Sequence, residues 1–263
     1  MDLIVVGCSG SVPGPDSVAS SYLIQAPHQG RTFSLLLDIG PGALGALYRY
    51  LDPRELDAIG ISHLHPDHCL DACAFYVAAR YSPGRPWNHT EIYGPTGTAE
   101  RLQRAYEVPT IVGGLTESGP GIGNHFRYTD WAAEQQIGPF LVRTVRVDHP
   151  VEAYAIRVQH SVPDGGSLVF SGDTGPCQAL VDLARGADLL LSEAAFLEGT
   201  ANPPGLHLTG AQAAAAGAAA EVGAVMLTHI PPWHDAEQVL SEAVPHFDGP
   251  VVLAQAGGRW TIG

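Results

Sequence analysis

The ten-residue stretch SHLHPDHCLD, residues 62–71, is the feature that most restricts how this chain can fold. The apolar segment DAIGIS before it predicts a strand, and the pattern from Pro66 to Tyr81 predicts a helix. The stretch is therefore expected on a turn from strand to helix, where α/β folds expose functional groups. It places three histidines and an aspartate within six positions: His63, His65, Asp67 and His68.

The spacing inside this cluster is typical of metal ligands. His63 and His65 are two residues apart at a strand end, so both side chains point the same way and can reach one ion. Asp67 and His68 follow on the turn and can face a second ion. The alternative, four solvated surface residues, does not explain such a density of imidazoles.

One turn cannot supply every ligand of a metal site, so further ligands are expected at other strand ends. Three candidates follow predicted strands: His149 in VRVDHP, Asp173 in LVFSGDTG and His229 in VMLTHIPP. Each of them alone is more typical of a cap or a satisfied polar residue. Together with the cluster they indicate a metal centre assembled from several strands.

The charge of the chain restricts its substrate. The 263 residues carry a formal charge of −14, and all 13 basic residues are arginines because the sequence has no lysine. Proteins that bind nucleic acids neutralise phosphates with clustered Lys and Arg, so nucleic acid is disfavoured as a partner. A compact substrate held mainly by metal ions remains compatible.

The remaining composition predicts one globular domain spanning residues 1–263. The 45% hydrophobic content supports a sizeable core, and no apolar run approaches the length of a membrane span. The first residues are strand-like and lack the features of a signal peptide, so we expect a cytoplasmic protein. The four cysteines form no CxxC pair and are expected as reduced thiols.

Strands and helices alternate after an opening β-meander. The glycine-rich stretch of residues 108–130 is expected to be a long surface loop near the site. Strands are expected at 3–7, 20–26, 32–40, 57–62, 91–94, 140–147, 153–158, 167–173, 188–194, 224–230 and 250–255, and helices at 42–51, 66–81, 176–184, 209–223 and 235–244.

On these residues the chain resembles the metallo-β-lactamase superfamily, whose HxHxDH motif is matched in full. The resemblance implies an α/β (α+β) fold, a four-layer αββα sandwich, with two metal ions at one edge. In that pattern His63, His65 and His149 hold one ion, Asp67, His68 and His229 hold the second, and Asp173 bridges them. The nitrogen and oxygen ligands suit zinc, and manganese or iron are compatible.

Within the superfamily the chain most resembles the RNase Z-like branch. The segment SEAAF, residues 192–196, matches the branch's "HEAT"-type motif, and HLTGAQAA, which begins at His207, matches its second histidine motif. The resemblance implies that Glu193 orients His207, which lies outside the ligand set and can protonate a leaving group. For His207 alone, the alternative is a polar residue at a helix N-terminus.

Departures from RNase Z favour a small substrate over tRNA. The segment PGPDSVAS replaces the basic loop of the tRNA-processing enzymes, IPPWHD replaces their final Ser-x-Arg-type motif, and only 23 residues separate His149 from Asp173, too few for their long arm. Three other stretches, GCSGSVPGPDS, HLHPDHCLD and THIPPW, resemble atypical class II cyclic nucleotide phosphodiesterases. The resemblance implies hydrolysis of a 3′,5′-cyclic nucleotide, with cAMP favoured, by a hydroxide that bridges two ions and is oriented by Asp67.

Several alternatives stay open. An RNase Z-type tRNA 3′ endoribonuclease is the second interpretation, a non-catalytic metal-binding accessory or carrier protein the third, and lactone or thioester hydrolysis a further one. Trp233 is expected either to stack on the base or to anchor its loop. The resemblance also implies a homodimer, with the apolar helix after Pro66 as a possible interface.

Overall fold

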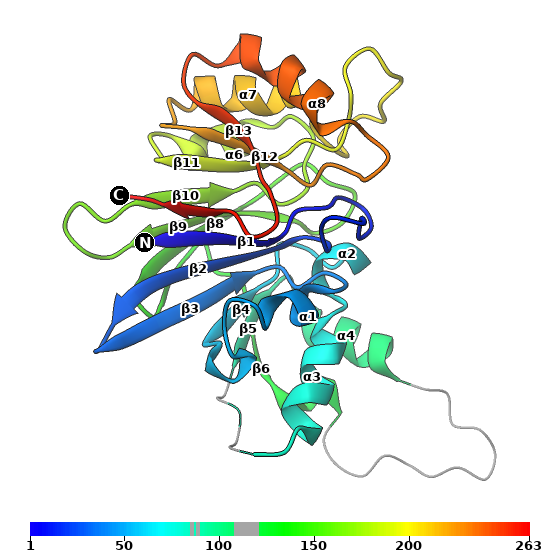
Figure 1. Cartoon of the computed structure of the whole chain (residues 1–263), viewed down its shortest axis with the longest axis vertical. Helices are drawn as coiled ribbons and strands as arrows, with labels where there is room; N and C mark the ends of the chain where they lie inside the picture. Colours follow the sequence, from blue (N-terminus) through cyan, green and yellow to red (C-terminus); the bar gives the residue numbers. More distant parts are fainter. Residues whose placement is uncertain (85–86, 88–89, 108–120) are drawn as a thin grey trace.

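Two seven-stranded sheets form the centre of the computed structural model, which describes residues 1–84, 87, 90–107 and 121–263 (Figure 1). The order of the first sheet is β14-β1-β2-β3-β4-β5-β6, and that of the second is β13-β12-β11-β10-β9-β8-β7. The strands of the first sheet are β1 (Asp2–Gly7), β2 (Ser21–His28), β3 (Arg31–Leu37), β4 (Ala58–Gly60), β5 (Glu91–Gly94), β6 (Arg127–Asp130) and β14 (Arg259–Thr261). Those of the second are β7 (Glu134–Ile137), β8 (Phe140–Arg146), β9 (Tyr154–His160), β10 (Ser167–Phe170), β11 (Leu189–Glu193), β12 (Val225–Thr228) and β13 (Val251–Leu253).

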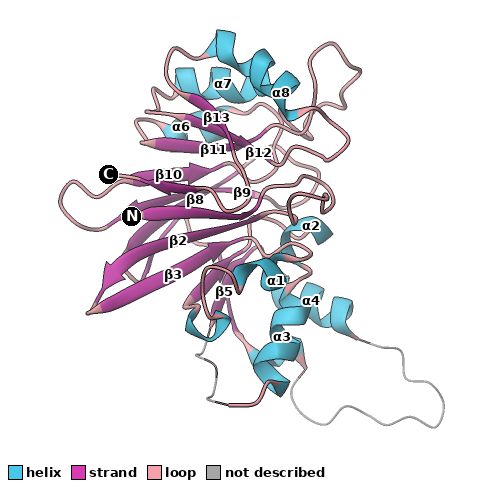
Figure 2. Cartoon of the chain, in the orientation of Figure 1, coloured by secondary structure: helices cyan, strands magenta, loops and turns pink. Residues whose placement is uncertain are grey.

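Helices cover the outer face of each sheet, as Figure 2 shows. The first sheet carries α1 (Ala43–Leu47), α2 (Pro66–Cys69), α3 (Ala72–Tyr81), α4 (Thr98–Tyr106) and α5 (Ile122–His125). The second carries α6 (Gln178–Ala184), α7 (Gly210–Ala219) and α8 (Ala236–Ala243). Short 3₁₀ helices lie at Pro53–Glu55 and Val244–His246. The predicted four-layer αββα sandwich is therefore confirmed.

The inner faces of the two sheets share one apolar core. Tyr22 of β2 packs on Phe170 of β10 with ring centroids 5.0 Å apart, and Phe33 of β3 meets Phe140 of β8 at 6.0 Å. Burying each side chain of this size contributes about 1.5–3 kcal/mol. The predicted meander is also present, because β2 pairs antiparallel with both β1 and β3.

The parallel strands end at the same edge of the sandwich. Strand β4 runs parallel to β3 and β5, and β11 runs parallel to β10 and β12. The predicted functional residues lie at the end of β11, where Glu193 is the last residue, and in the loops that follow β4, β8, β10, β11 and β12. Among the described residues, no helix is long and apolar enough to cross a membrane.

The predicted helix over residues 66–81 is wrong as a continuous helix. It divides into α2 and α3 because the chain between them bonds elsewhere: the His68 carbonyl accepts from Ile39 N–H, and Asp71 N–H donates to the Ile39 carbonyl. The Asp71 carboxylate also accepts from Leu44 N–H at 2.6 Å. The break fixes α2, and with it Asp67 and His68, against the end of β3.

The predicted loop over residues 108–130 is corrected in its second half. Residues 108–120 lie outside the described residues, but α5 and β6 follow, and β6 pairs parallel with β5. The Tyr128 hydroxyl donates to the Ile122 carbonyl at 2.7 Å and ties the helix to the strand. The helix predicted over residues 42–51 is also shorter than expected: α1 ends at Leu47.

Candidate metal centre

The HxHxDH segment is held between the two sheets. Ile61 N–H donates to the Tyr93 carbonyl of the first sheet, and Tyr154 N–H of the second donates to the Ser62 carbonyl. His63 itself forms an isolated bridge with Ala153. Pro66 begins α2, where its missing N–H costs no helical hydrogen bond. This arrangement turns the side chains of the segment toward the loops of the second sheet.

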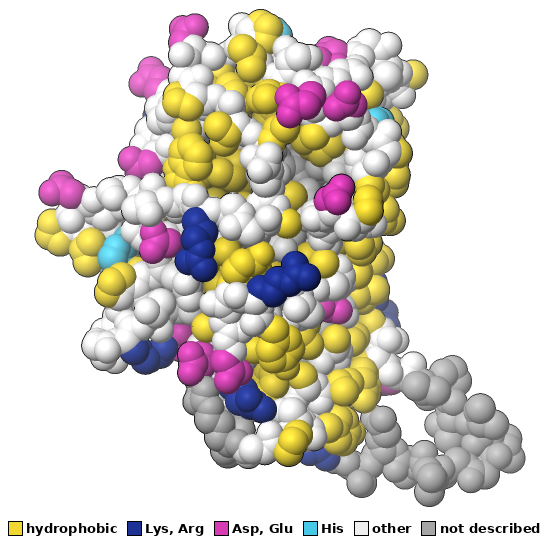
Figure 3. Space-filling model, viewed as in Figure 1, with side chains coloured by type: hydrophobic (Ala, Val, Ile, Leu, Met, Phe, Trp, Pro, Cys, Tyr) yellow, Lys and Arg dark blue, Asp and Glu magenta, His cyan; other side chains and the backbone are white. Residues whose placement is uncertain are grey.

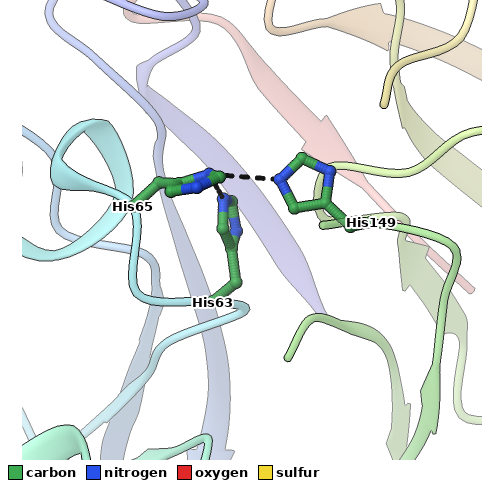
Figure 4. Close-up of side chains that lie close together, drawn as sticks. All are labelled: His63, His65 and His149. Carbon is green, nitrogen blue, oxygen red and sulfur yellow. Dashed lines mark hydrogen bonds between the residues drawn. The ribbon is translucent and has the colours of Figure 1, made fainter. Parts of the chain in front are cut away.

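His63, His65 and His149 converge on one point, as Figure 4 shows. His65 Nδ1 lies 3.0 Å from His63 Nε2 and 3.1 Å from His149 Nε2. Nitrogen atoms that bind one zinc ion at 2.0–2.1 Å in a tetrahedron lie about 3.3 Å apart. The three rings therefore already have the spacing of ligands around one ion.

A second group lies beside the first and consists of Asp67, His68, Asp173 and His229. His229 Nε2 is 3.1 Å from both His68 Nε2 and Asp67 Oδ2. The residues of this group come from α2, from the loop after β10 and from the residue after β12. Asp67 and His68 are thus brought to Asp173 and His229 by the packing of the two sheets.

Asp173 presents one carboxylate oxygen to each group. Its Oδ2 lies 3.7 Å from His63 Nε2, while its Oδ1 lies 3.3 Å from His68 Nε2 and 3.5 Å from His229 Nε2. Oδ1 is buried and accepts no hydrogen bond from the described residues. A buried carboxylate oxygen without a donor is costly unless a cation binds it.

These donor atoms fit divalent metal ions. Hydrogen bonds cannot satisfy three imidazole nitrogens that all point at one another, because neutral rings offer one N–H each. A cation at the centre of each group satisfies all of the lone pairs at once. The cluster and the fold therefore imply bound divalent metals. All seven side chains predicted from the sequence lie in the two groups, and their individual roles as ligands stay predictions.

The titration of these groups follows from their burial and their neighbours. Burial lowers the pKa of His63, His65 and His149, which keeps them in the neutral form that binds metals. Burial alone would raise the pKa of Asp67 and Asp173, but neighbouring histidines, His229 foremost, hold both below the ordinary value.

His68 differs from the other histidines. Burial disfavours its charged form, but the carboxylates of Asp173 and Asp38 outweigh burial and raise its pKa well above the ordinary value. The hydrogen bond to Asp38 places a proton on Nδ1, and Nε2 is the nitrogen that faces the second group.

Asp38 is a functional candidate that the sequence analysis missed. Its Oδ2 accepts from His68 Nδ1 at 2.6 Å and from the Ser62 hydroxyl at 3.0 Å, and its Oδ1 accepts from Ser62 N–H at 2.7 Å. It is fully buried and has a left-handed backbone, with φ 58°. A carboxylate behind a ligating histidine fixes the ring's orientation and tautomer. The signal was an aspartate that directly follows the buried strand SLLL.

His207 lies beside both groups and has a buried partner. Its Nδ1 is 2.9 Å from Glu193 Oε1, and the same oxygen accepts from Thr174 N–H at 2.8 Å. Burial would lower the pKa of His207, but the hydrogen bond and charge of Glu193 raise it. Burial raises the pKa of Glu193, in part offset by His207. The predicted pair is thus in contact, with His207 able to carry a proton.

Trp233 lies on the loop after β12 and is 63% exposed. Its ring contacts His234 at a centroid distance of 6.2 Å. An indole exposed to this extent contributes little as an anchor, so its apolar face is free for a ligand. Whether it contacts substrate stays a prediction.

The fold and this centre together define a metal-dependent hydrolase. The chain belongs to the beta-lactamase superfamily: the family profile described as "Beta-lactamase superfamily domain" matches residues 34–230. The chain is similar to the Mycobacterium leprae protein ML1173, with 44% identity over 99% of this chain and 88% of that protein.

Other relatives support the RNase Z-like branch. The chain is 28% identical to the probable metallo-hydrolase YhfI of Bacillus subtilis over 99% of both chains, and the crystal structure of YhfI superposes with a TM-score of 0.82. It is also 26% identical to ribonuclease BN of Escherichia coli, over 89% of this chain and 90% of that protein.

Proposed function

We propose that this protein hydrolyses 3′,5′-cyclic nucleotides, with cAMP as the favoured substrate, to 5′-monophosphates. The observation that carries the proposal is the contact between Glu193 and His207 beside the two ligand groups. Hydrolysis of a phosphodiester requires a proton for the departing alkoxide, and a histidine held by a buried carboxylate can supply it. The pair therefore favours a hydrolase over a non-catalytic carrier protein.

Two divalent ions, of which zinc suits the ligands best, would polarise the phosphodiester and lower the pKa of the attacking water. The protein's own residues position the attacking water and protonate the leaving oxygen. Asp67 Oδ2 lies 3.1 Å from His229 Nε2, within the second group, and can orient the attacking water. His207 donates its proton to the leaving oxygen, while Glu193 holds the ring through Nδ1 and leaves Nε2 for the substrate.

Charge supports a small substrate. The chain carries a formal net charge of −14 and has no lysine. On the face that Figure 3 shows, the basic side chains of the described residues form no continuous patch. A polyanion such as tRNA would be repelled by most of this surface. A single cyclic phosphate can be bound locally at the metal centre, without a basic surface around it.

The test uses zinc- and manganese-loaded protein with cAMP, cGMP, 2′,3′-cyclic AMP, bis(p-nitrophenyl) phosphate and a precursor tRNA. Products are separated by chromatography, and Asp67→Ala serves as the control. We expect 5′-AMP from the wild type alone. Cleavage of the artificial diester without 5′-AMP would retain phosphodiester chemistry and reject the cyclic nucleotide.

The similarity to ribonuclease BN favours one second candidate, a tRNA 3′ endoribonuclease. Trimming of the precursor tRNA with cyclic nucleotides left intact would establish it in place of the first. Full metal loading without turnover of any substrate would instead support a non-catalytic metal-binding protein.

A further inference from the structure

The loop after β1 touches the metal centre through a backbone amide. Ser11 N–H points at His229 Nε2, with the two nitrogens 3.4 Å apart. Ser11 is one of the few non-glycine residues with a left-handed backbone, at φ 61°, and it is the middle residue of a three-residue turn closed by Val12 N–H on the Gly10 carbonyl at 2.6 Å. Turns of this kind with a positive φ are rare and strained.

The strained turn is pressed against His229. His229 N–H donates to the Cys8 carbonyl at 3.0 Å, and Gly10 N–H donates to the Ile230 carbonyl at 3.1 Å. A Cβ atom on Gly10 would lie 2.1 Å from the His229 carbonyl oxygen, so only glycine allows this approach. His229 is itself left-handed, with φ 56°. Strain on both sides of one contact is typical of a functional site.

A metal ion bound in the second group would leave the Ser11 amide without its acceptor. The nearest acceptor of this N–H is the nitrogen that faces His68 and Asp67 in the second ligand group. An ion held there would take the lone pair of His229 Nε2, and the neighbouring N–H would then require another acceptor. The acceptor that suits a partly buried N–H next to a cation is an anion.

We propose that Ser11 N–H is an anion-binding group of the active site. It donates a hydrogen bond to a non-bridging oxygen of the bound phosphodiester. The inference rests on the proposed phosphodiester hydrolysis for the identity of its anion. It explains how a chain without lysine supplements the metal ions in binding a phosphate. A backbone donor also adds no net charge that would attract longer polyanions.

The direct test is an NMR titration of ¹⁵N-labelled, zinc-loaded protein with inorganic phosphate. We expect the Ser11 amide proton to move downfield in a saturable way, with the same dissociation constant as the phosphate inhibition of turnover. A Ser11 resonance that stays in place while other amides of the site respond to phosphate would overturn the proposal.

Two substitutions at Ser11 separate the amide from the side chain. Ser11→Gly keeps the N–H and accepts the positive φ, so phosphate affinity should stay within about threefold of the wild type. Ser11→Val keeps the N–H but disfavours the left-handed backbone that aims it, so the dissociation constant should rise about ten- to a hundredfold. A side-chain contact would instead make both variants equally weak, and that result would also overturn the proposal.

Gln29 provides the matched control, because it is also exposed and left-handed, at φ 49°, but lies in the hairpin between β2 and β3. Gln29→Val should leave phosphate affinity unchanged. Zinc content is measured for every variant. The wild type could show the phosphate-induced shift of the Ser11 amide proton but cleave no phosphodiester. In that case the proposed function is wrong, and the assignment of Ser11 N–H as an anion-binding group is retained.

Discussion

His207 Nδ1 and Glu193 Oε1 lie 2.9 Å apart at the side of a cluster that fits divalent metals, and the Glu193 side chain is completely buried. Glu193 also accepts backbone N–H groups from Thr174 and Ala195. The carboxylate is therefore fixed from three directions and can hold the imidazole in one orientation. Because Nδ1 faces Glu193, Nε2 is the nitrogen that remains for proton transfer.

Glu193→Gln should lower kcat about 10²-fold or more, the usual contribution of a general acid. Burial lowers the pKa of His207 and the Glu193 carboxylate more than offsets it, so loss of that charge must lower the pKa. The protonated fraction then disappears at a lower pH, and the basic limb of the kcat profile should move to lower pH. Metal content should not change.

The exposed pair of Glu134 and Arg143 offers the control. Glu134→Gln should leave both kcat and its pH profile as they are, because a surface ion pair contributes about 0–1 kcal/mol. An unshifted basic limb in Glu193→Gln would contradict His207 as the proton donor.

Asp67→Asn should damage the chemistry more than the fold. The carboxylate lies 3.1 Å from His229 Nε2 and 3.4 Å from His68 Nε2, and asparagine has nearly the same shape with a weaker oxygen donor. We expect metal content, measured by mass spectrometry, to fall from about two ions per chain to about one. Activity should fall about 10²- to 10³-fold. Retention of both ions with full activity would exclude Asp67 from the centre.

Asp38→Asn tests the carboxylate behind His68. Loss of such a partner typically weakens metal binding about 10- to 100-fold. The matched control is Asp57→Asn, since the Asp57 carboxylate also accepts a backbone N–H, from Ser34 at 2.9 Å, but at the opposite end of the same strands. Equal metal affinity in both variants, from competition with a fluorescent chelator, would show that Asp38 only stabilises the fold.

The convergence of these strand ends could be predicted because chemistry and local pattern agree there. His149 and His229 follow apolar runs that form strands, so their identity and position together indicate an edge site. Asp38 follows β3 in the same way, but the strand predicted over residues 32–40 runs through it, so the sequence did not mark it as a strand-end residue. Its role depends on Ser62 and His68, which approach it only through the pairing of β3 with β4.

Other elements were missed because their signals are tertiary. Helix α4 is mostly polar, and its sequence lacks an N-terminal capping side chain. Strand β14 has three residues, and its pairing with β1 depends on the whole chain in between. The division between α2 and α3 comes from bonds of His68 and Asp71 to Ile39, which no helical periodicity contains.

Trp233→Ala tests whether the exposed indole binds the base. Stacking of a base on an aromatic ring contributes about 1–3 kcal/mol, so KM for cAMP should rise about 5- to 150-fold with kcat nearly unchanged. KM for bis(p-nitrophenyl) phosphate, which has no nucleobase, should change less. Tyr48, 55% exposed at the end of α1, is the control position. A variant that unfolds would favour the loop-anchor interpretation instead.

Removal of the metal ions should lower thermal stability. Without a cation the centre buries the Asp173 carboxylate, with its unpartnered Oδ1, and His63 beside converging imidazoles. Ligand at a hundred times its dissociation constant stabilises the folded state by about 2.7 kcal/mol, which for a chain of this length corresponds to a Tm change of about 5–10 °C. Calorimetry with and without chelator measures the change in Tm, and added zinc should restore the original Tm.

Asp67→Asn should show a smaller decrease in Tm on chelation, because it has one ion fewer to lose. An unchanged Tm in the wild type, with loss of the ions verified by mass spectrometry, would contradict the interpretation that these buried side chains form a metal centre.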